Sequence, residues 1–322
     1  MKETYTIGID LGGTFVKVGL IGNGLIIDCS VFESNMHNGL EANLPDLKST
    51  ILDIIDRNNV LVNELTGISL AFPGIVDATN SKVLSTNEKY DDACRLNLEA
   101  WCEINFGVPF YIDNDARLAT IGEWKYGGAK GLNNVVMMTL GTGIGTSVIL
   151  DGRVMYGEHF QAGSLGGHFV VDYKGRKCSC GNIGCVEAHA SSFFLQRIIE
   201  ESDSLSAAFK AESKEYTFEK LFCLSKENEE AQSLINECLN VWAAAIVTYI
   251  HAYDPQIVIV GGGIMKSEDL ILPFLRRYVD ENAWCPTQKV EIVASELGDN
   301  AAVLAAEYCL INKIRKSESA KI

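Results

Sequence analysis

The sequence predicts an α/β protein built from two related domains. Strand-like apolar segments alternate with helix-like segments along most of the 322 residues, a pattern typical of α/β folds. Two glycine-rich segments far apart in the chain, residues 9–24 and 138–152, resemble each other. A repeat at this separation indicates two related domains, and the chain is long enough for each domain to bury its own core.

The alternation can be followed along the chain. Each glycine-rich segment predicts a strand, a glycine turn, a second strand and then a tight Asn-Gly or Asp-Gly turn. The other expected elements are a helix over 44–59, a strand over 65–72 before a Pro73-Gly74 turn, a strand over 108–112, a capped helix within 113–127, a long apolar helix over 233–253, a buried strand ending in Gly261-Gly262-Gly263, and a final helix over 300–312.

The composition excludes several classes of function. A formal net charge of −15 argues against binding nucleic acid, because that affinity depends on clustered Lys and Arg. The N-terminal residues resemble a strand and not a signal peptide, and no uninterrupted apolar run reaches membrane-spanning length. Most of the ten cysteines stand singly in apolar segments, as expected of reduced thiols. We expect a cytoplasmic protein with neither nucleic acid nor membrane as a partner.

Both glycine-rich turns have residues suited to phosphate. In the first, Asp10 precedes the turn residues Gly12, Gly13 and Thr14. Glycines let backbone N–H groups approach a phosphate, a threonine adds a hydroxyl, and an aspartate can hold Mg²⁺. An aspartate before two glycines can also do no more than shape a turn. The later glycine segments, 140–145 and 260–264, are not P-loops, which need Lys and Ser/Thr after their glycines.

The second turn repeats this pattern, and a third glycine segment follows later in the chain. Gly141, Thr142 and Gly143 form the second turn, and two such turns facing each other would clamp phosphates between domains. The segment Gly261-Gly262-Gly263 would leave an open shelf for a purine or ribose, although an ordinary strand-to-helix turn has the same composition.

Three polar residues follow the strand expected over 108–112. Asp113, Asn114 and Asp115 stand at the carboxyl end of that strand, where open α/β sheets place their sites. One of them is expected to cap the following helix. Because capping needs one residue and three are present, a carboxylate remains that can take the proton from an attacking hydroxyl, as phosphoryl transfer to an alcohol requires.

Taken together, the motifs resemble those of the ROK sugar kinases of the hexokinase–actin superfamily. The matching segments are DLGGT, FPGIVD, NDAR, LGTGIG, GGH…CSCGNIGCVE and VIVGGG, in this order along essentially the whole chain. The resemblance implies two ribonuclease-H-like domains around a central cleft. We expect the first over 1–116, with 302–322 packing back onto it, and the second over 117–301. It also implies a homodimer.

The resemblance assigns roles to individual residues. Asp115 matches the catalytic base that deprotonates the 6-hydroxyl of the sugar, and the adjacent Asn114 matches a ligand of the sugar hydroxyls. The glycine turns match the elements that bind ATP. The remaining residues implied to line or grip the sugar are Gly74, Thr86, Asn87, His168 and Glu187.

The cysteine-rich segment is the most specific part of the resemblance. His168, Cys178, Cys180 and Cys185 look like four ligands of a structural Zn²⁺, because four N and S ligands leave no open position for catalysis. Coincidental free thiols or a disulfide would explain the pattern less well in a cytoplasmic protein. A zinc ion there would hold the loop that carries His168 and Glu187.

One position departs from the family pattern. A glutamate that contacts the sugar usually stands three residues before the histidine, and here Leu165 or, with a shift of one residue, Ser164 takes its place. Loss of that carboxylate is expected to change sugar specificity or weaken binding. The sequence therefore predicts an ATP-dependent kinase that phosphorylates a hexose or hexosamine at its 6-hydroxyl, with the exact sugar open.

Three alternatives fit the sequence less well than a kinase. A catalytically silent sugar sensor is suggested by the lost glutamate, but Asp10, Asn114 and Asp115 remain. Sugar-responsive regulators of the same family carry an N-terminal helix-turn-helix domain, and none is expected here because the first glycine motif starts at Ile7. An actin-like or chaperone-like ATPase is disfavoured by the cysteine segment.

Overall fold

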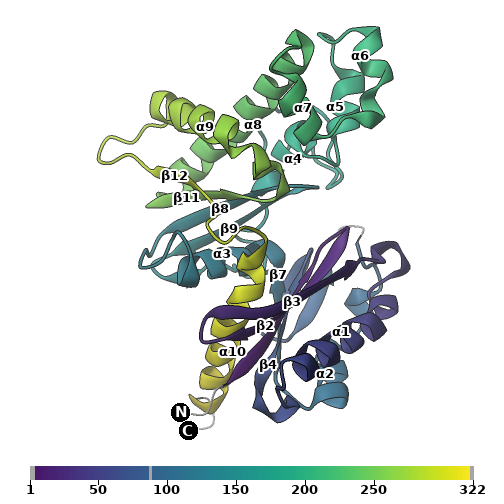
Figure 1. Cartoon of the computed structure of the whole chain (residues 1–322). Coiled ribbons are helices and arrows are strands. Elements are labelled where there is room, and N and C mark those ends of the chain that lie inside the picture. The colour runs from purple at the N-terminus through teal and green to yellow at the C-terminus, as the bar shows by residue number, and fades with distance from the viewer. Residues whose placement is uncertain (1–3, 87–88, 320–322) are drawn as a thin grey trace. The chain divides into compact units, whose positions relative to one another are not determined.

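The computed structural model describes residues 4–86 and 89–319, and these form two compact units (Figure 1). Unit 1 contains the chain up to Gly131, residues 156–162 and the chain from Leu297 onward. Unit 2 contains Leu132–Met155 and Gly163–Glu296. The predicted boundary at residue 116 lies fifteen residues before Gly131 because the helix that follows it packs within unit 1.

Unit 1 is built on a five-stranded sheet with the order β3-β2-β1-β4-β7. Strands β1, β2 and β3 form an antiparallel meander, while β4 and β7 run parallel to β1. A small separate hairpin, β5–β6, follows β4. The bounds are β1 Tyr5–Leu11, β2 Phe15–Gly22, β3 Leu25–Glu33, β4 Leu65–Phe72, β5 Ile75–Asp77, β6 Lys82–Ser85 and β7 Phe110–Asn114.

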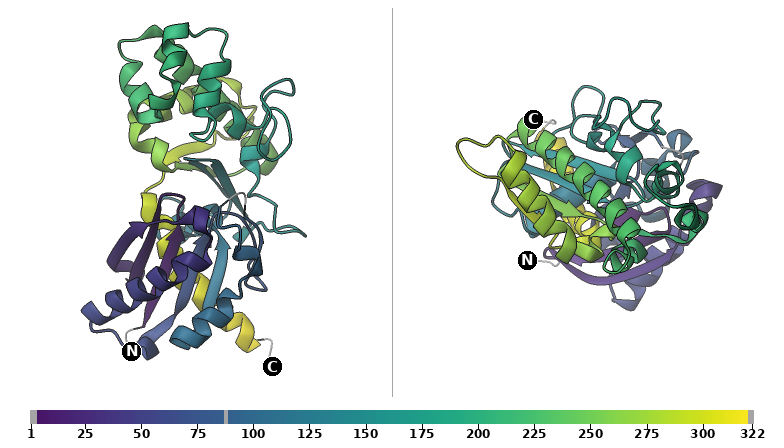
Figure 2. Two further views of the ribbon diagram at one scale, coloured as in Figure 1. Left: turned by 90° about the vertical axis from the view of Figure 1, so that its right-hand side faces the viewer. Right: turned by 90° about the horizontal axis from the view of Figure 1, so that it is seen from above.

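Helices pack against both faces of this sheet (Figure 2). Their bounds are α1 Leu44–Arg57, α2 Leu98–Phe106, α3 Asp115–Tyr126 and α10 Ala301–Ser319. Helix α1 buries Leu47 and Ile51 in the core beneath β1 and β2. On the other face α10, yellow in Figure 2, approaches so closely that a Cβ at Gly8 or Gly19 would collide with Val303. These glycines thus allow α10 to lie directly on β1 and β2.

Unit 2 repeats the strand order of unit 1. Its sheet runs β10-β9-β8-β11-β12, with β8, β9 and β10 antiparallel and with β11 and β12 parallel to β8. The bounds are β8 Val135–Leu140, β9 Ile144–Leu150, β10 Arg153–Val154, β11 Ile257–Gly261 and β12 Glu291–Ala294. This shared topology confirms the repeat that the two glycine-rich segments predict.

Several helices of unit 2 pack against the long helix α8. Their bounds are α4 Val186–Ala190, α5 Leu195–Glu201, α6 Ala207–Ala211, α7 Phe218–Leu224, α8 Glu229–Tyr253 and α9 Glu268–Asn282. Helix α8 is long and apolar enough to cross a membrane by length and composition. Its apolar residues instead fill the core of unit 2, where Trp242 and Tyr249 are fully buried, so core packing accounts for the composition.

Most of the elements expected from the sequence are present. The predicted strand over 65–72 is β4, and the helices predicted over 44–59 and 233–253 are α1 and α8. The predicted tight turns join β2 to β3 and β9 to β10. The two central residues of each have positive φ: 55° and 75° at Asn23 and Gly24, and 49° and 68° at Asp151 and Gly152. Such turns match the twist of the adjoining strands.

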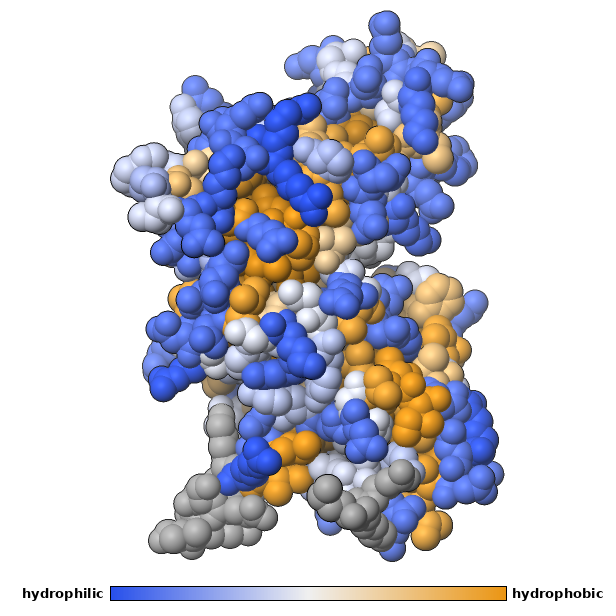
Figure 3. All heavy atoms as spheres, turned by 60° about the vertical axis from the view of Figure 1, so that its left-hand side comes forward, coloured by the Kyte–Doolittle hydropathy of each residue, from blue (hydrophilic) through white to orange (hydrophobic). Residues whose placement is uncertain are grey.

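On the face drawn in Figure 3, hydrophilic residues alternate with apolar patches.

Candidate functional site

The first glycine turn joins β1 to β2 in unit 1. A Cβ at Gly12 would lie 2.5 Å from the carbonyl oxygen of Phe15, so glycine is required for the turn to close this tightly. The hydroxyl of Tyr90 donates a hydrogen bond to the Gly12 carbonyl at 2.9 Å. Thr14 is exposed at the end of the turn, and its carbonyl accepts the N–H of Ser34 at 2.9 Å. Tyr90 and Ser34 therefore hold the turn by hydrogen bonds to its carbonyls, while Thr14 stays exposed.

Asp10 stands on β1 just before this turn, opposite Lys17 on β2. Its pKa is raised to about 7, first by burial and then by the negative charges of Asp115 and Asp299, while Lys17 acts in the opposite direction. A carboxylate that is costly to ionise is stabilised by a cation. Asp10 is thus suited to hold Mg²⁺, and Asp115 lies near enough to raise the pKa of Asp10 electrostatically.

The three polar residues at the end of β7 have separate tasks. Asn114 caps α3, and its side-chain oxygen accepts the N–H of Arg117 at 3.1 Å. The Asn114 amide also donates to the carbonyl of Gly74 at 3.0 Å and to Asp115 Oδ1 at 2.9 Å. The Asn114 side chain therefore connects two other predicted site residues, Gly74 and Asp115.

Asp113 is fully buried and has a structural role. Its carboxylate accepts hydrogen bonds from the hydroxyls of Tyr156 at 2.7 Å and Tyr111 at 3.0 Å, and lies 3.5 Å from Arg117. Burial raises its pKa in spite of these partners. Because Tyr156 belongs to the segment 156–162, Asp113 anchors that segment within unit 1.

Asp115 is the carboxylate left for chemistry. It begins α3, and its Oδ1 also accepts the N–H of Ala116 at 2.8 Å. Burial raises the pKa of Asp115, whereas these hydrogen bonds and the positive charge of Lys89 lower it. These contacts fix the carboxyl group at the end of the sheet and partly offset burial, which leaves the pKa of Asp115 raised.

The predicted sugar-pocket segment is described in part. The Thr86 hydroxyl donates to Asp91 Oδ1 at 2.9 Å, which fixes the start of the loop between β6 and α2. Asn87, also predicted to line the pocket, lies outside the described residues. Gly74 is constrained, because a Cβ there would collide with the carbonyl of Ser85.

The second glycine turn joins β8 to β9 in unit 2, and a carboxylate secures it. Glu187, 7% exposed, accepts the N–H of Ile144 at 2.9 Å. A Cβ at Gly143 would lie 2.5 Å from Oε2 of Glu187, so glycine makes room for this carboxylate. The carbonyls of Gly141 and Thr142 accept N–H groups from residues 192 and 193. Glu187 therefore contacts the second glycine turn directly.

The third glycine segment lies beside the second turn. Gly262 has φ of 90°, and a Cβ there would collide with the backbone of Leu140. Gly263, by contrast, has open space where its Cβ would be. The structure therefore brings Gly262 against Leu140, the residue just before the second glycine turn.

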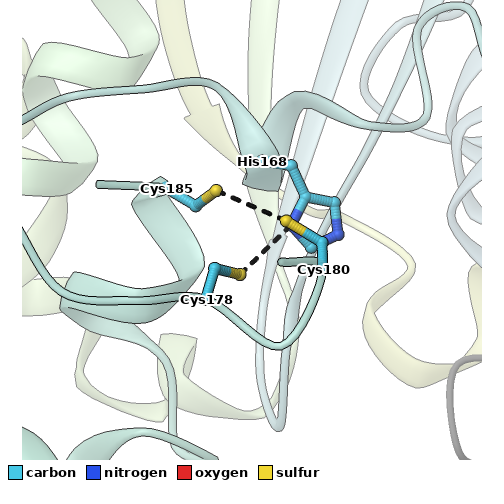
Figure 4. Close-up of side chains that lie close together, drawn as sticks. All are labelled: His168, Cys178, Cys180 and Cys185. Atoms are coloured by element: carbon cyan, nitrogen blue, oxygen red, sulfur yellow. Dashed lines mark hydrogen bonds between the residues drawn. The ribbon is translucent and has the colours of Figure 1, made fainter. Parts of the chain in front are cut away.

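The cysteine-rich loop brings His168, Cys178, Cys180 and Cys185 together (Figure 4). One potential ligand atom of each lies within 4.8 Å of all the others. The loop doubles back at Gly181 and Gly184, whose φ values are 90° and 78°. Burial, followed by its cysteine neighbours, raises the pKa of Cys185 well above its usual range. Crowded thiols of this kind become stable thiolates when a cation joins them.

The distances fit a tetrahedral zinc ion. Cys178 Sγ lies 3.6 Å from His168 Nδ1, and Cys180 Sγ lies 3.7 Å from Cys185 Sγ. Ligands about 2.0–2.3 Å from a tetrahedral Zn²⁺ lie about 3.4–3.8 Å from one another. With Nδ1 directed at the thiols, Nε2 of His168 remains for another partner. Cys185 precedes α4, which carries Glu187, so this loop also determines where Glu187 lies.

Ser164 and Leu165 are both partly buried just before the short 3-10 helix Gly166–His168. The Leu165 carbonyl accepts the His168 N–H at 3.0 Å. Neither residue supplies a carboxylate beside His168.

Sequence reasoning missed three residues of unit 1. Lys89 and Tyr90 contact the first glycine turn, and Asp299 acts electrostatically on Asp10. Lys89 and Tyr90 come shortly after the predicted residues Thr86 and Asn87, and this proximity in sequence is only a weak signal. Asp299 comes just before α10 and belongs to no motif. Only packing of distant segments brings these residues to the site.

The paired topology defines the class of fold, that of the hexokinase-like and actin-like ATPases, as the sequence predicts. The ROK family model matches residues 6–313. The chain therefore belongs to the ROK family, which confirms the resemblance found in its motifs.

Individual relatives include both enzymes and regulators. The glucokinase of Thermotoga maritima is 29% identical over 98% of this chain and 99% of its own length. The xylose repressor of Bacillus spizizenii is 27% identical over 96% of this chain and 78% of its own. The ROK family glucokinase of Streptomyces griseus, solved in complex with glucose and AMPPNP, has a TM-score of 0.79 at 23% identity, covering 94% of this chain and 98% of that one.

Proposed function

We propose that this protein is an ATP-dependent sugar kinase that phosphorylates the 6-hydroxyl of a hexose or hexosamine, with Asp115 as the general base. The observation that carries the proposal is the arrangement at the start of α3. Asn114 and the N–H of Ala116 hold the Asp115 carboxyl in place. Asp10 and Asp115 lie close enough to interact electrostatically. A fixed carboxylate near a glycine turn suits phosphoryl transfer to an alcohol.

In the proposed reaction Asp115 accepts the proton of the sugar 6-hydroxyl. The sugar oxygen forms a bond to the γ-phosphorus of ATP, the bond from that phosphorus to the β,γ-bridging oxygen breaks, and ADP leaves. The two glycine turns, Gly12-Gly13-Thr14 and Gly141-Thr142-Gly143, would bind the phosphates through backbone N–H groups, and Gly261–Gly263 would support the adenosine.

Asp10 would hold Mg²⁺, which neutralises phosphate charge when bound. The raised pKa of Asp10 supports this role, because a cation would relieve the cost of burying that carboxylate. His168, Cys178, Cys180 and Cys185 would hold a structural Zn²⁺. Its contribution would be to fix the loop before α4 and, through that loop, the position of Glu187.

The sugar pocket would include Gly74, Thr86, Asn87, Asn114 and the two loop residues His168 and Glu187. Ser164 and Leu165, in place of an acidic residue, would favour a sugar that needs no carboxylate contact at that position. We further propose a cytoplasmic homodimer. A catalytically silent sugar-responsive regulator is the second candidate, because the chain also matches the xylose repressor of Bacillus spizizenii over 96% of its length.

The test is a coupled assay for ADP release with Mg-ATP and a panel of sugars: glucose, mannose, fructose, allose, glucosamine, N-acetylglucosamine and N-acetylmannosamine. We expect one or a few sugars to stimulate turnover, and Asp115→Asn to reduce that turnover by about 100-fold or more. Asp203→Asn, at an exposed position in unit 2, is the matched control and should leave turnover unchanged.

The second candidate predicts a different result. Sugar binding detected by calorimetry, without sugar-stimulated ADP release in a sample that contains zinc and binds Mg-ATP, would contradict the kinase proposal and favour the regulator.

A further inference from the structure

Two adjacent residues outside the predicted motifs contact the first glycine turn. Lys89 is partly buried, and its Cε and Nζ lie 3.8 and 3.9 Å from the position that a Cβ on Gly13 would occupy. Tyr90, the next residue, donates its hydroxyl hydrogen bond to Gly12 at 2.9 Å. One short segment therefore supports the turn with a phenol and places an ammonium group beside it.

Tyr90 is held in place strongly enough to keep an unusual backbone conformation. Its φ is 56°, in the left-handed region that few residues other than glycine adopt. The side chain is fully buried, and its hydroxyl also lies 2.7 Å from the Ser34 hydroxyl. Its N–H donates to the carbonyl of Met36 at 3.2 Å. Because both the backbone and the side chain of Tyr90 are fixed, the backbone position of the adjacent Lys89 is restricted as well.

The charges around Lys89 make its ammonium group available to an anion. The other nearby cation, Lys17, already donates to Asn300 Oδ1 and to the Asp299 carbonyl. Among the described residues, Nζ of Lys89 has neither a hydrogen-bond nor an ion-pair partner. It acts on Asp115 through space, lowering the pKa of that carboxyl against the effect of burial. Its charge thus lies beside the glycine turn and is near enough to Asp115 to act on that carboxyl.

We propose that Lys89 is a further catalytic residue, which binds the phosphoryl group as it passes from ATP over the first glycine turn to the sugar, and that Tyr90 is a positioning residue for that turn. The inference rests on the proposed kinase function. In phosphoryl transfer, negative charge spreads over the three equatorial oxygens of the moving group. A fixed ammonium beside the phosphate-binding turn stabilises that charge where it develops.

The test compares Lys89→Met with Lys89→Arg and with Lys82→Met, a control at an exposed lysine on β6 in the same unit. We expect Lys89→Met to reduce kcat about 100-fold, with the KM of the sugar changed less than about threefold. Lys89→Arg should recover part of this loss because it keeps the positive charge. Lys82→Met should behave as the wild type. Loss expressed only in the KM of the sugar would contradict the proposal.

A binding measurement separates this inference from the kinase function. Calorimetry with Mg-AMPPNP and Mg-ADP gives the preference for a γ-phosphate without any turnover. Lys89→Met should weaken Mg-AMPPNP about tenfold and leave Mg-ADP unchanged. If the wild type phosphorylates no sugar but the variant shows this selective loss, the kinase function and the catalytic role of Lys89 both fail, and only binding of the γ-phosphate by Lys89 is supported. Equal affinities for wild type and Lys89→Met would overturn the role of Lys89.

Tyr90→Phe tests the positioning role, since it removes the hydroxyl and keeps the ring. We expect kcat to fall about tenfold while the KM of the sugar stays within about threefold. A purely structural role predicts the reverse, a lower Tm with kcat unchanged.

Discussion

The two glycine hairpins have the same topology but different surroundings. Each joins the first two strands of a five-stranded sheet with the same order. When Leu11-Gly12 is aligned with Leu140-Gly141, Thr139 is the residue equivalent to Asp10. The first hairpin therefore has an aspartate at the end of its strand and the second does not. The second turn instead receives a carboxylate from elsewhere, Glu187 on α4.

The carboxylates at the two hairpins also differ in the groups that surround them. Glu187 accepts a backbone N–H and so stabilises the turn it contacts. Asp10 has two acidic neighbours, and its pKa is raised to about 7. The two units therefore share a turn of the same topology, while ionisable groups gather at the first hairpin. We infer that the first hairpin supports the chemistry and the second supports binding.

Zinc removal should produce the largest effect, and it should fall on unit 2. Stripping Zn²⁺ with a chelator, or Cys178→Ser, is expected to lower Tm by about 10 °C or more, because structural zinc contributes several kcal/mol to folding. Hydrogen exchange should rise first around α4 and the second turn, and less in unit 1. Elemental analysis should find one zinc per chain, and Cys223→Ser, at an exposed thiol, is the control. A metal-free wild type with an unchanged Tm would refute the zinc assignment.

Alanine substitution should distinguish the two turns. Gly12→Ala is expected to cost about 1–3 kcal/mol of unfolding free energy, because its Cβ would lie 2.5 Å from a backbone oxygen. The counterpart Gly141→Ala has its nearest atom at 4.0 Å and should be close to neutral. Urea denaturation measures both, and equal losses would show that the packing of the two turns does not differ as described.

Removing each carboxylate should change stability in opposite directions. Glu187→Gln weakens a charge-assisted hydrogen bond to Ile144 and is expected to cost about 1–2 kcal/mol. Asp10→Asn removes a carboxylate that is costly to ionise, and without Mg²⁺ it should stabilise the protein by about 1 kcal/mol at pH 8. Denaturation in the presence of EDTA measures both values. Destabilisation by both variants would remove the basis of the comparison.

The benefit of Asp10→Asn should depend on pH. The pKa of Asp10 is raised from 3.8 to about 7 on folding, so between these values the folded state keeps a proton that the unfolded state releases. The contribution of Asp10 to the unfolding free energy therefore falls as pH rises through this range. The gain in Tm should be near zero at pH 4 and largest above pH 7. Asp203→Asn, the exposed control, should give no such trend.

Much of the fold could be predicted because local patterns determine it. The strand over 65–72 and the hairpin turns at Asn23-Gly24 and Asp151-Gly152 follow from apolar runs and turn residues. Helix α9 and the hairpin β5–β6 were not predicted. They lack strong local signals: α9 contains Pro273, and β5 has only three residues.

The candidate site was predictable where a motif carries it. The glycine turns, the polar residues at the end of β7 and the four N/S donors each form a local pattern. The contacts of Lys89, Tyr90 and Asp299 were not predictable, because they depend on how a loop and the start of α10 pack against the first hairpin. The contact between Asp113 and Tyr156 was not predictable for the same reason, since Tyr156 lies 43 residues away in sequence.

The most direct measurement follows the phosphoryl group itself. Mg-ATP labelled at the γ-phosphate is incubated with the sugar that best stimulates ADP release, and the label is located in the products by chromatography and NMR. The account predicts label on the 6-hydroxyl oxygen of the sugar, with about 100-fold less transfer by Asp115→Asn. Label found solely in inorganic phosphate, or transfer by Asp115→Asn at the wild-type rate, would contradict it.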